Sequence, residues 1–236
     1  MPAGSIVQAL HRRGKQLVLE TRRHGCLLVH LGMSGSLRLV REGEQVEMDR
    51  HVHAEWGFGL VDGSSCRLLH RDPRRFGWLE VHDDIDAVHR AWQASLGPDA
   101  LELQVDSIAE AMRRSARPVK AVLLDQSVVA GIGNIYADES LFRASVHPSR
   151  KARSLDEVTL RRLVGSIRSV LRKAVDMGGS TIRDHRTVEG RWGSYQRLHR
   201  VYGRGDLPCH RCGTPLRSMT LQQRATVFCP RCQRLR

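Results

Sequence analysis

Four cysteines near the C-terminus have the spacing of a metal site. They form two pairs, Cys209-His-Arg-Cys212 and Cys229-Pro-Arg-Cys232, with sixteen residues between the pairs. Two Cys-x-x-Cys pairs at this separation present four thiolates to one ion, and tetrahedral sulfur coordination suits Zn²⁺. Four sulfurs leave no position for water, so we expect one structural zinc ion. Disulfides or a chance repetition are the alternative interpretations.

The residues between the two pairs predict a short hairpin held by this zinc. Thr214 to Thr220 and Ala225 to Phe228 are interpreted as two strands, with Leu221-Gln-Gln-Arg224 at the exposed tip. An arginine at the tip of such a hairpin is well suited to grip a phosphate group.

The charge balance indicates a polyanionic partner. Lysine and arginine number 38 against 25 aspartate and glutamate residues, for a formal net charge of +13. A surface this basic attracts polyanions at long range, and nucleic acid is the commonest of them. The alternative is a merely basic protein from an arginine-rich proteome.

No apolar run has the length of a membrane span, and no signal-peptide core is present. Cys26 and Cys66 lie in apolar strand patterns and are expected to be buried thiols. This cysteine usage favours a reducing cytoplasm, where we expect a nucleoid-associated protein that makes no membrane contact.

The chain divides into three parts by pattern. Residues 1–105 are interpreted as short strands punctuated by glycine turns, typical of an antiparallel β-sandwich. Residues 106–199 are mainly helical and include a double turn at 125–133, and residues 200–236 form the zinc ribbon. The strands are expected at 16–20, 26–31, 36–40, 67–70 and 78–81.

Five motifs, taken in order along the chain, then point to one family. They are His30-Leu-Gly-Met-Ser-Gly-Ser-Leu37, Asp72-Pro-Arg-Arg-Phe-Gly77, Leu124-Asp-Gln-Ser-Val-Val-Ala-Gly-Ile-Gly-Asn-Ile-Tyr-Ala-Asp-Glu-Ser-Leu141, Val201-Tyr-Gly-Arg204 and Gln223-Arg-Ala-Thr-Val-Phe-Cys229. Together with the zinc ribbon they closely resemble the formamidopyrimidine-DNA glycosylase family, from about Arg12 to Cys232. The resemblance implies an α+β multidomain protein: an incomplete N-terminal antiparallel β-sandwich, a helix–two-turn–helix domain and a C-terminal zinc ribbon. DNA is expected in the cleft between the sandwich and the helical part.

Three residues are expected to fill the gap left when a damaged nucleotide leaves the stack. A glycosylase acting on duplex DNA must extrude its target base. Met33 and Phe76 can occupy the vacated space while the fork of Arg74 hydrogen-bonds the orphaned base. Taken alone, Met33 is better interpreted as a turn residue packed on the sheet; its flanking glycines and the Pro-Arg-Arg-Phe loop make the inserted wedge the better interpretation.

The resemblance assigns the remaining DNA contacts and two auxiliary groups. Asn134, at a helix start, is expected to contact a phosphate, to act as a simple N-cap, or to do both. Lys120 is expected either at the phosphate beside the lesion or as a solvated helix lysine. Arg224 matches the family's zinc-finger arginine, which binds DNA. Lys15 and Arg224 are both implied to assist the elimination step.

The chain departs from the family's pattern at its opening. The resemblance implies a terminal proline whose secondary amine attacks the sugar C1′, followed by a glutamate and a long helix. This chain begins Met1-Pro2-Ala3-Gly4-Ser5, without an acidic residue. We expect a recorded start that lies too far downstream, or a truncated relative that binds without cutting; Pro2 as a substitute amine is a further reading. The 236-residue form is therefore expected to show little base excision and only slow abasic-site cleavage.

The resemblance implies a monomeric base-excision repair enzyme, a DNA glycosylase and AP lyase. Its expected substrates are oxidised purines, namely 8-oxoguanine and formamidopyrimidines, in damaged double-stranded DNA. The alternative is a non-catalytic DNA-damage-binding protein of the same fold. A third class, an RNA-associated zinc-ribbon protein, is disfavoured by the motifs at 72–77 and 124–141.

Overall fold

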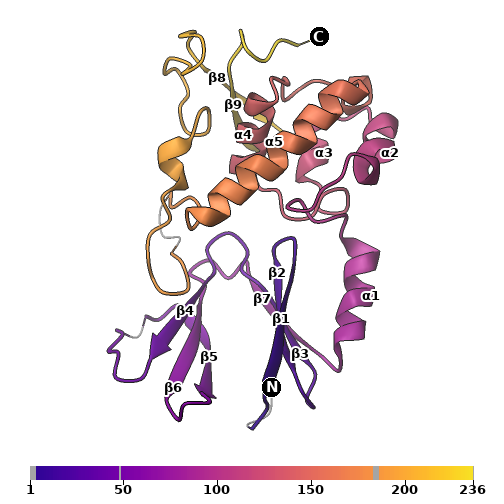
Figure 1. Cartoon of the computed structure of the whole chain (residues 1–236). Helices are drawn as coiled ribbons and strands as arrows, with labels where there is room; N and C mark the ends of the chain where they lie inside the picture. The colour runs from indigo at the N-terminus through magenta and orange to yellow at the C-terminus, as the bar shows by residue number, and fades with distance from the viewer. Residues whose placement is uncertain (1–3, 48, 183–185, 236) are drawn as a thin grey trace. The chain divides into compact units, whose positions relative to one another are not determined.

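The computed structural model describes residues 4–47, 49–182 and 186–235 (Figure 1). Pro2 therefore lies outside the described residues. The chain forms two compact units: residues 1–89 with 176–196, and residues 90–175 with 197–236. The sequence predicts three domains instead, with the zinc ribbon separated from the helices at residue 200.

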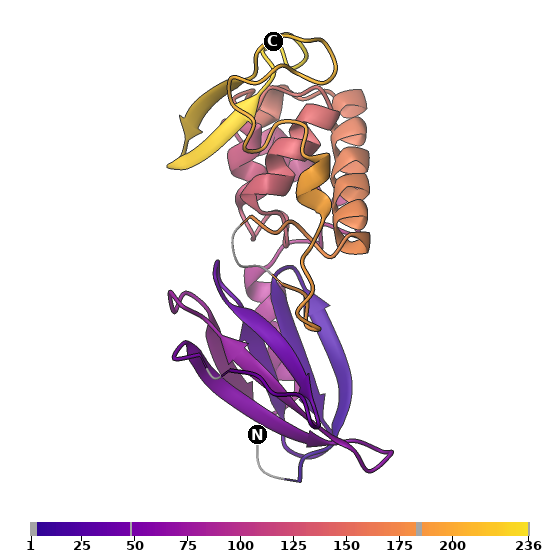
Figure 2. The ribbon, with the colours of Figure 1, turned by 90° about the vertical axis from the view of Figure 1, so that its left-hand side faces the viewer.

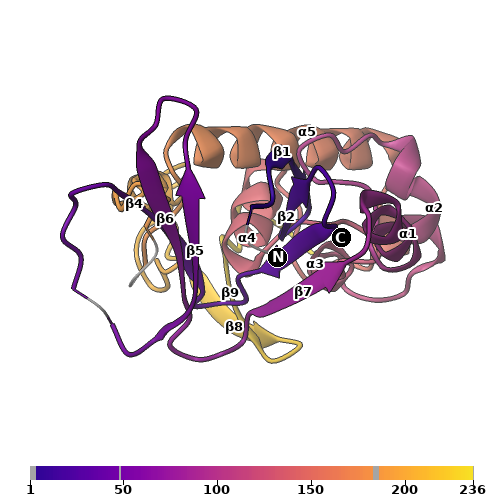
Figure 3. The same ribbon diagram turned by 90° about the horizontal axis from the view of Figure 1, so that it is seen from below.

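The first unit is a sandwich of two antiparallel sheets, seen from below in Figure 3. One sheet has the order β1-β2-β3-β7 and the other β4-β6-β5. A small apolar core draws on both sheets and comprises Leu19, Leu27, Val29, Leu37 and Leu68. The strands are β1 (Val7–Arg13), β2 (Gln16–Thr21), β3 (Cys26–His30), β4 (Ser36–Arg41), β5 (Val52–Gly59), β6 (Ser65–Arg71) and β7 (Trp78–His82).

The five predicted strands are confirmed, with small shifts at their ends. The strands β1 and β5 are additional, and β1 continues up to the turn at Gly14. A helix, α1 (Ile85–Ser95), also lies in the region that the pattern assigned to β structure. Cys26 and Cys66 are buried, as predicted.

The second unit contains the helices and the zinc ribbon; Figure 2 shows the hairpin alongside the helices. Its core gathers apolar residues from α2, α3, α4 and α5 and from the turns between them. The elements are α2 (Asp106–Arg114), α3 (Val119–Leu124), α4 (Asn134–Arg143), η1 (Ala152–Ser154), α5 (Glu157–Asp176), η2 (Tyr195–Leu198), β8 (Arg217–Leu221) and β9 (Arg224–Phe228). The element η2 crosses the boundary between the units in the chain.

The side chain of Gln126 holds much of the double turn between α3 and α4. The Gln126 amide oxygen accepts from the Gly131 N–H at 2.9 Å, and its nitrogen donates to the Leu124 and Ile132 carbonyls. Gly131 has a φ of 107°, a conformation that favours glycine. This arrangement closes the turn without a helical hydrogen-bond ladder and sets where α4 begins.

Among the helices of the described ranges, none is long and apolar enough to cross a membrane.

Candidate nucleic-acid interface

The four C-terminal cysteines converge as the spacing predicts. The Sγ atoms of Cys209, Cys212, Cys229 and Cys232 all lie within 4.8 Å of one another. Tetrahedral Zn–S bonds of about 2.3 Å require sulfur–sulfur separations of about 3.8 Å, so the donor set fits one Zn²⁺. Backbone N–H groups point at two of the sulfurs, from Arg211 to Cys209 and from Cys232 to Cys229. The site is therefore structural, because the protein supplies all four ligands.

The hairpin above the metal presents Arg224 to solvent. Strands β8 and β9 pair antiparallel, and Leu221 faces Arg224 in the register. Gln222 and Gln223 form the two-residue turn with positive φ values of 46° and 58°. Such a turn matches the twist of its strands. The predicted hairpin is confirmed, but β8 begins three residues later than expected, and Leu221 and Arg224 are the last and first strand residues on either side of the turn.

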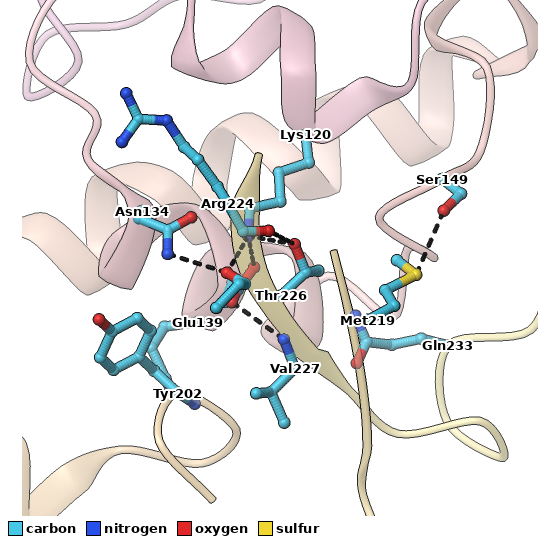
Figure 4. A network of polar contacts seen from close by, with 12 residues as sticks. Lys120, Asn134, Glu139, Ser149, Tyr202, Met219, Arg224, Thr226, Val227 and Gln233 are labelled. Carbon is cyan, nitrogen blue, oxygen red and sulfur yellow. Dashed lines mark hydrogen bonds and ion pairs between the residues drawn. The ribbon is translucent and has the colours of Figure 1, made fainter. Parts of the chain in front are cut away.

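The position of Lys120 corrects its predicted role. Its side chain is only 1% exposed and its Nζ lies 2.6 Å from Asp138 Oδ1. The same ammonium donates to Thr226 Oγ1 at 2.7 Å and to the Ala225 carbonyl at 3.2 Å. A buried ammonium with three protein acceptors is not that of a solvated helix lysine, and in this structure it exposes no surface with which to contact a phosphate. Lys120 instead ties α3 to α4 and to the hairpin (Figure 4).

Burial dominates the electrostatics of this pair. Burial lowers the pKa of Lys120, although Asp138 opposes the effect. Burial raises the pKa of Asp138 to about 6, although Lys120 acts to lower it. Asp138 also accepts the Val227 N–H at 3.2 Å, so one carboxylate joins the lysine to the middle of β9.

Asn134 is the first residue of α4 but not its cap. The N-cap position is Gly133, which makes no side-chain cap hydrogen bond. The Asn134 amide nitrogen donates to the Ala225 carbonyl at 2.9 Å. Its Oδ1 is buried and has no hydrogen-bond partner among the described residues. The carbonyl next to Arg224 is thus held by Asn134 and Lys120 together, which fixes the base of the arginine.

A second buried carboxylate on α4 holds the start of the ribbon. Glu139 is 3% exposed. Its Oε1 accepts three successive backbone N–H groups, those of Arg200, Val201 and Tyr202, at 2.9–3.0 Å. One carboxylate receiving three N–H groups is a charge-assisted arrangement that orders the segment. It explains why the 201–204 motif adjoins the helical part.

In the sandwich unit, the two predicted wedge loops are joined by Asp72. This carboxylate is 1% exposed. It accepts the Ser34 hydroxyl at 2.6 Å from one loop and the Gly77 N–H at 2.7 Å from the other. A Cβ at Gly32 would lie 2.5 Å from the Phe76 carbonyl carbon, so only glycine allows the loops to approach this closely. The chain therefore builds one composite loop from residues 32–36 and 72–77.

The composite loop exposes apolar side chains that a core would normally bury. Met33 is 64% exposed and Phe76 is 54% exposed. The Arg74 guanidinium carbon lies 5.2 Å from the centroid of the Phe76 ring. The structure thus brings together all three residues predicted to fill a vacated stack position. Met33 is not packed on the sheet, which removes the alternative interpretation given above.

Lys15 is exposed at the β1–β2 turn. Burial lowers the pKa of His30, and the charge of Lys15 lowers it further. In the β2–β3 register His30 faces Gln16, the residue after Lys15. His30 stacks on Trp78 with ring centroids 5.6 Å apart. The sequence reasoning found Lys15 but gave no role to Asp72, Asp138 or Glu139. The one feature that could have identified these residues is that each is an acidic residue inside a family motif of a basic chain.

Three family models match the chain, one after another along the sequence. Residues 2–79 match the family model of the formamidopyrimidine-DNA glycosylase N-terminal domain, and residues 96–186 match that of the formamidopyrimidine-DNA glycosylase H2TH domain. Residues 206–235 match the zinc finger found in FPG and IleRS.

Relatives match almost the whole chain. The formamidopyrimidine-DNA glycosylase of Aromatoleum aromaticum is 44% identical over 233 residues, which cover 98% of this chain and 83% of that protein. The Thermus thermophilus MutM (Fpg) structure has a TM-score of 0.85 at 40% identity, covering 99% of this chain and 85% of that one. A Lactococcus lactis Fpg complex with DNA containing an abasic site has a TM-score of 0.87 at 32% identity, covering 98% and 83%. Identity of this extent shows that the chain is a member of the formamidopyrimidine-DNA glycosylase family and an enzyme of that family.

Proposed function

We propose that this enzyme is a base-excision repair glycosylase and AP lyase that acts on oxidised purines, 8-oxoguanine and formamidopyrimidines, in duplex DNA. The named relatives are formamidopyrimidine-DNA glycosylases, and solved Lactococcus lactis structures hold DNA with Fapy-dG or with an abasic site. The observation that carries the proposal is the composite loop, in which Asp72 joins the segment that carries Met33 to the segment that carries Arg74 and Phe76 by accepting from Ser34 and Gly77.

The composite loop supplies what base extrusion requires. Removing a base from the stack costs a few kcal/mol and leaves a gap that apolar side chains can fill. Met33 is unbranched and exposed, and Phe76 offers a flat ring beside it. Arg74, held near that ring, provides planar donors for the base left without a partner. Asp72 keeps these groups in place before DNA arrives, so their ordering cost is met in folding.

The hairpin tip supplies a separate phosphate contact. Arg224 is exposed, and the carbonyl that follows it is anchored by two donors. A guanidinium binds phosphate oxygens in a bidentate manner, and a fixed backbone lowers the entropy lost on binding. We assign Asn134 a supporting contact with phosphate. It is the first residue of α4, and the N–H groups at the N-terminus of a helix favour an anion.

For the lyase step we assign auxiliary roles to Lys15 and Arg224. An uncharged amine attacks C1′ of an abasic sugar in its aldehyde form, water leaves, and a Schiff base results. Loss of a C2′ proton then breaks the C3′–O bond, and the 3′ phosphate leaves with the bonding electron pair. Lys15 is the exposed primary amine assigned to this chemistry, and Arg224 stabilises phosphate charge.

Borohydride trapping separates this enzyme from a non-catalytic damage-binding protein. The chain is incubated with duplexes containing 8-oxoguanine, a preformed abasic site or intact guanine, and adducts are mapped by mass spectrometry. We expect a covalent adduct on abasic DNA, and release of 8-oxoguanine in preference to guanine at any absolute rate. Tight binding to damaged duplex without adduct or base release would favour the binder, an alternative that the names of the relatives do not support.

We further propose that the enzyme acts as a monomer associated with the nucleoid. A net charge of +13 opposes self-association and favours residence on DNA. Light scattering at low salt, with and without duplex, tests the one-chain stoichiometry; a dimeric mass in both conditions would contradict it.

A further inference from the structure

A basic cavity of about 600 Å³ lies beside the zinc site in the second unit. It is lined by four arginines, two hydroxyl residues, one aspartate and one zinc-ligand cysteine: Arg150, Arg162, Arg231, Arg234, Ser145, Thr159, Asp156 and Cys232. We propose that this cavity, the arginine pocket, binds a phosphate group at a site separate from the Arg224 contact.

The arginine pocket lies at the opposite end of its supporting elements from Arg224. Asn134, at the start of α4, contacts Ala225 beside the hairpin tip. Gln233, just after the second cysteine pair, donates to the Val146 carbonyl just beyond the end of α4. At 1.5 Å per residue, the path along α4 from Asn134 to Ser145 is roughly 16 Å. One phosphate cannot reach both places.

The charges that line the pocket are not balanced by protein groups. Asp156 is the one carboxylate in the lining, and its Oδ1 accepts the Thr159 N–H at 2.7 Å. Arg162 uses Nε to bind the Ala144 carbonyl at 2.8 Å, and Arg150 binds Ser154. Within the described ranges, the guanidinium groups of Arg231 and Arg234 have no hydrogen-bond or ion-pair partner. Four guanidinium groups against one carboxylate leave a lining charge of +3.

A phosphate group suits the chemistry of this lining. Guanidinium forks match phosphate oxygens in a bidentate manner, and the Ser145 and Thr159 hydroxyls lie in the same wall. The arginines also come from three separate segments, the 144–156 connection, α5 and the second cysteine pair, so they surround a common space.

A zinc ion bound by four thiolates carries a net charge of −2, and this offers a competing explanation for the arginines. Only one of the four cysteines lines the cavity, and two of the sulfurs already receive backbone N–H groups. Arg150 and Arg162 belong to the helical part rather than to the ribbon. The metal site can offset at most two of the three excess charges, so the lining stays positive with zinc bound and can accept a further anion.

The test uses the full chain loaded with zinc and an Arg231→Gln/Arg234→Gln variant. Both residues are exposed and unpaired, so folding is preserved. Arg90→Gln/Arg113→Gln removes the same charge from exposed helix positions and is the matched control. Equilibrium dialysis with radiolabelled inorganic phosphate measures binding, duplex titration at several salt concentrations measures the DNA contribution, and elemental analysis measures zinc.

We expect one phosphate per chain and about a tenfold or greater loss of affinity in the pocket variant alone, which identifies a free phosphate ligand. If free phosphate does not bind, a salt slope for duplex binding that is shallower by about 1 in the pocket variant alone identifies a backbone phosphate instead. Equal behaviour of the two variants overturns the proposal. Loss of zinc from the pocket variant without any anion effect also overturns it and supports the counter-charge explanation. None of these outcomes depends on lesion recognition or strand cleavage.

Discussion

At the scale of single residues, two buried aspartates organise the molecule under opposite electrostatic conditions. Burial would raise the pKa of Asp72, but hydrogen bonds led by that from Ser34 outweigh it, and the pKa is lowered. At Asp138 burial wins, and the pKa is raised to about 6 despite the nearby Lys120. Asp72 is thus held as a carboxylate by its donors, whereas Asp138 depends on its lysine.

Replacing Asp72 by Asn should destabilise the sandwich unit at neutral pH. The amide has one acceptor oxygen for two donors, Ser34 and Gly77, so one buried donor loses its partner at a cost of about 1–3 kcal/mol. Because the folded pKa is below its unfolded value, this stabilisation is present above about pH 4 and is lost as the pH falls through the folded pKa. Urea unfolding at pH 7 and pH 3 should show the difference shrinking in acid. Asp62→Asn, in an exposed turn, is the control, and an equal loss at both pH values would contradict the role.

Replacing Lys120 by Met should cost about 3–5 kcal/mol, because it leaves Asp138 buried without a counter-charge. A Lys120→Met/Asp138→Leu double variant should recover much of this loss, and Lys173→Met on the exposed part of α5 should change stability little. Duplex affinity, measured alongside urea unfolding, tests the structural role. It should recover with stability in the double variant; weak binding by a fully stable double variant would restore the direct phosphate contact.

The errors at residue scale have a common physical origin. Local spacing indicates that Lys120 lies one turn into a helix, but not that β9 will cover it from more than 100 residues away. Asn134 satisfies the composition of an N-cap, yet a tertiary carbonyl at Ala225 takes its amide. Cysteines, glycines and turn residues were predicted well because their roles depend on neighbours in the sequence. Buried polar partners depend on contacts that form only in the folded chain.

At the scale of elements, the zinc ribbon should not form its hairpin without metal. Its core consists of a few side chains around the cysteines, including Leu216 and Val227. So small a core cannot order the segment without the ion. We expect one zinc per chain by elemental analysis, and loss of zinc, Val227 amide protection and duplex affinity in Cys229→Ser. Cys66→Ala, a buried thiol outside the site, should retain the metal. Full zinc occupancy in Cys229→Ser would refute the assignment.

The composite loop should determine the preference for damaged DNA. An abasic site lacks a stacked base, so insertion there avoids part of the cost of unstacking. Met33→Ala should therefore reduce the ratio of abasic to intact duplex affinity by about 3–10-fold, on the order of 1 kcal/mol. Val61→Ala removes another exposed apolar group from a distant turn of the same unit and should leave the ratio unchanged. Equal binding of abasic and intact duplex by the unmodified chain would refute insertion.

Element prediction succeeded where strands are apolar and failed where they are not. The strands β2, β3 and β4 have continuous or alternating apolar residues and were found. Strand β5 alternates strictly between apolar and other residues, but Gly57 and Gly59 lower its strand propensity, and the pattern was missed although pairing with β6 completes its ladder. Helix α1 mixes apolar and polar residues nearly evenly and begins soon after β7 ends, so the sequence pattern does not separate it from that strand.

At the scale of the whole molecule, the chain is organised by long-range polar bonds as much as by sequence order. Polar bonds in both directions join the ribbon to the helices. On α4, Glu139 and Asp138 accept backbone N–H groups of the C-terminal segment, and Gln233 of the ribbon donates to the Val146 carbonyl. Segment 176–196 joins the sandwich unit instead, where the Val188 carbonyl accepts the Leu39 N–H at 2.9 Å. Sequence analysis places a domain boundary where the residue composition changes. The bonds that attach these two segments to their units leave no mark in the composition, so the sequence does not reveal the attachment.

Salt dependence should separate the two kinds of DNA contact that these units carry. Each phosphate contact contributes about −0.9 to the slope of log affinity against log salt for duplex DNA. Arg224→Gln should lower affinity for intact and abasic duplex alike and make the slope shallower by about 1, because its exposed guanidinium is assigned to a phosphate. Arg74→Gln should reduce abasic preference and leave the slope nearly unchanged, because that guanidinium is assigned to an orphaned base.

Arg113→Gln on α2 has the same charge change without an assigned contact and should alter neither quantity. Fluorescence titrations of all three variants between about 50 and 200 mM salt make the comparison. If the three slopes fall equally, the net charge of +13 acts only as a diffuse field, and the assigned contacts at Arg224 and Arg74 are wrong.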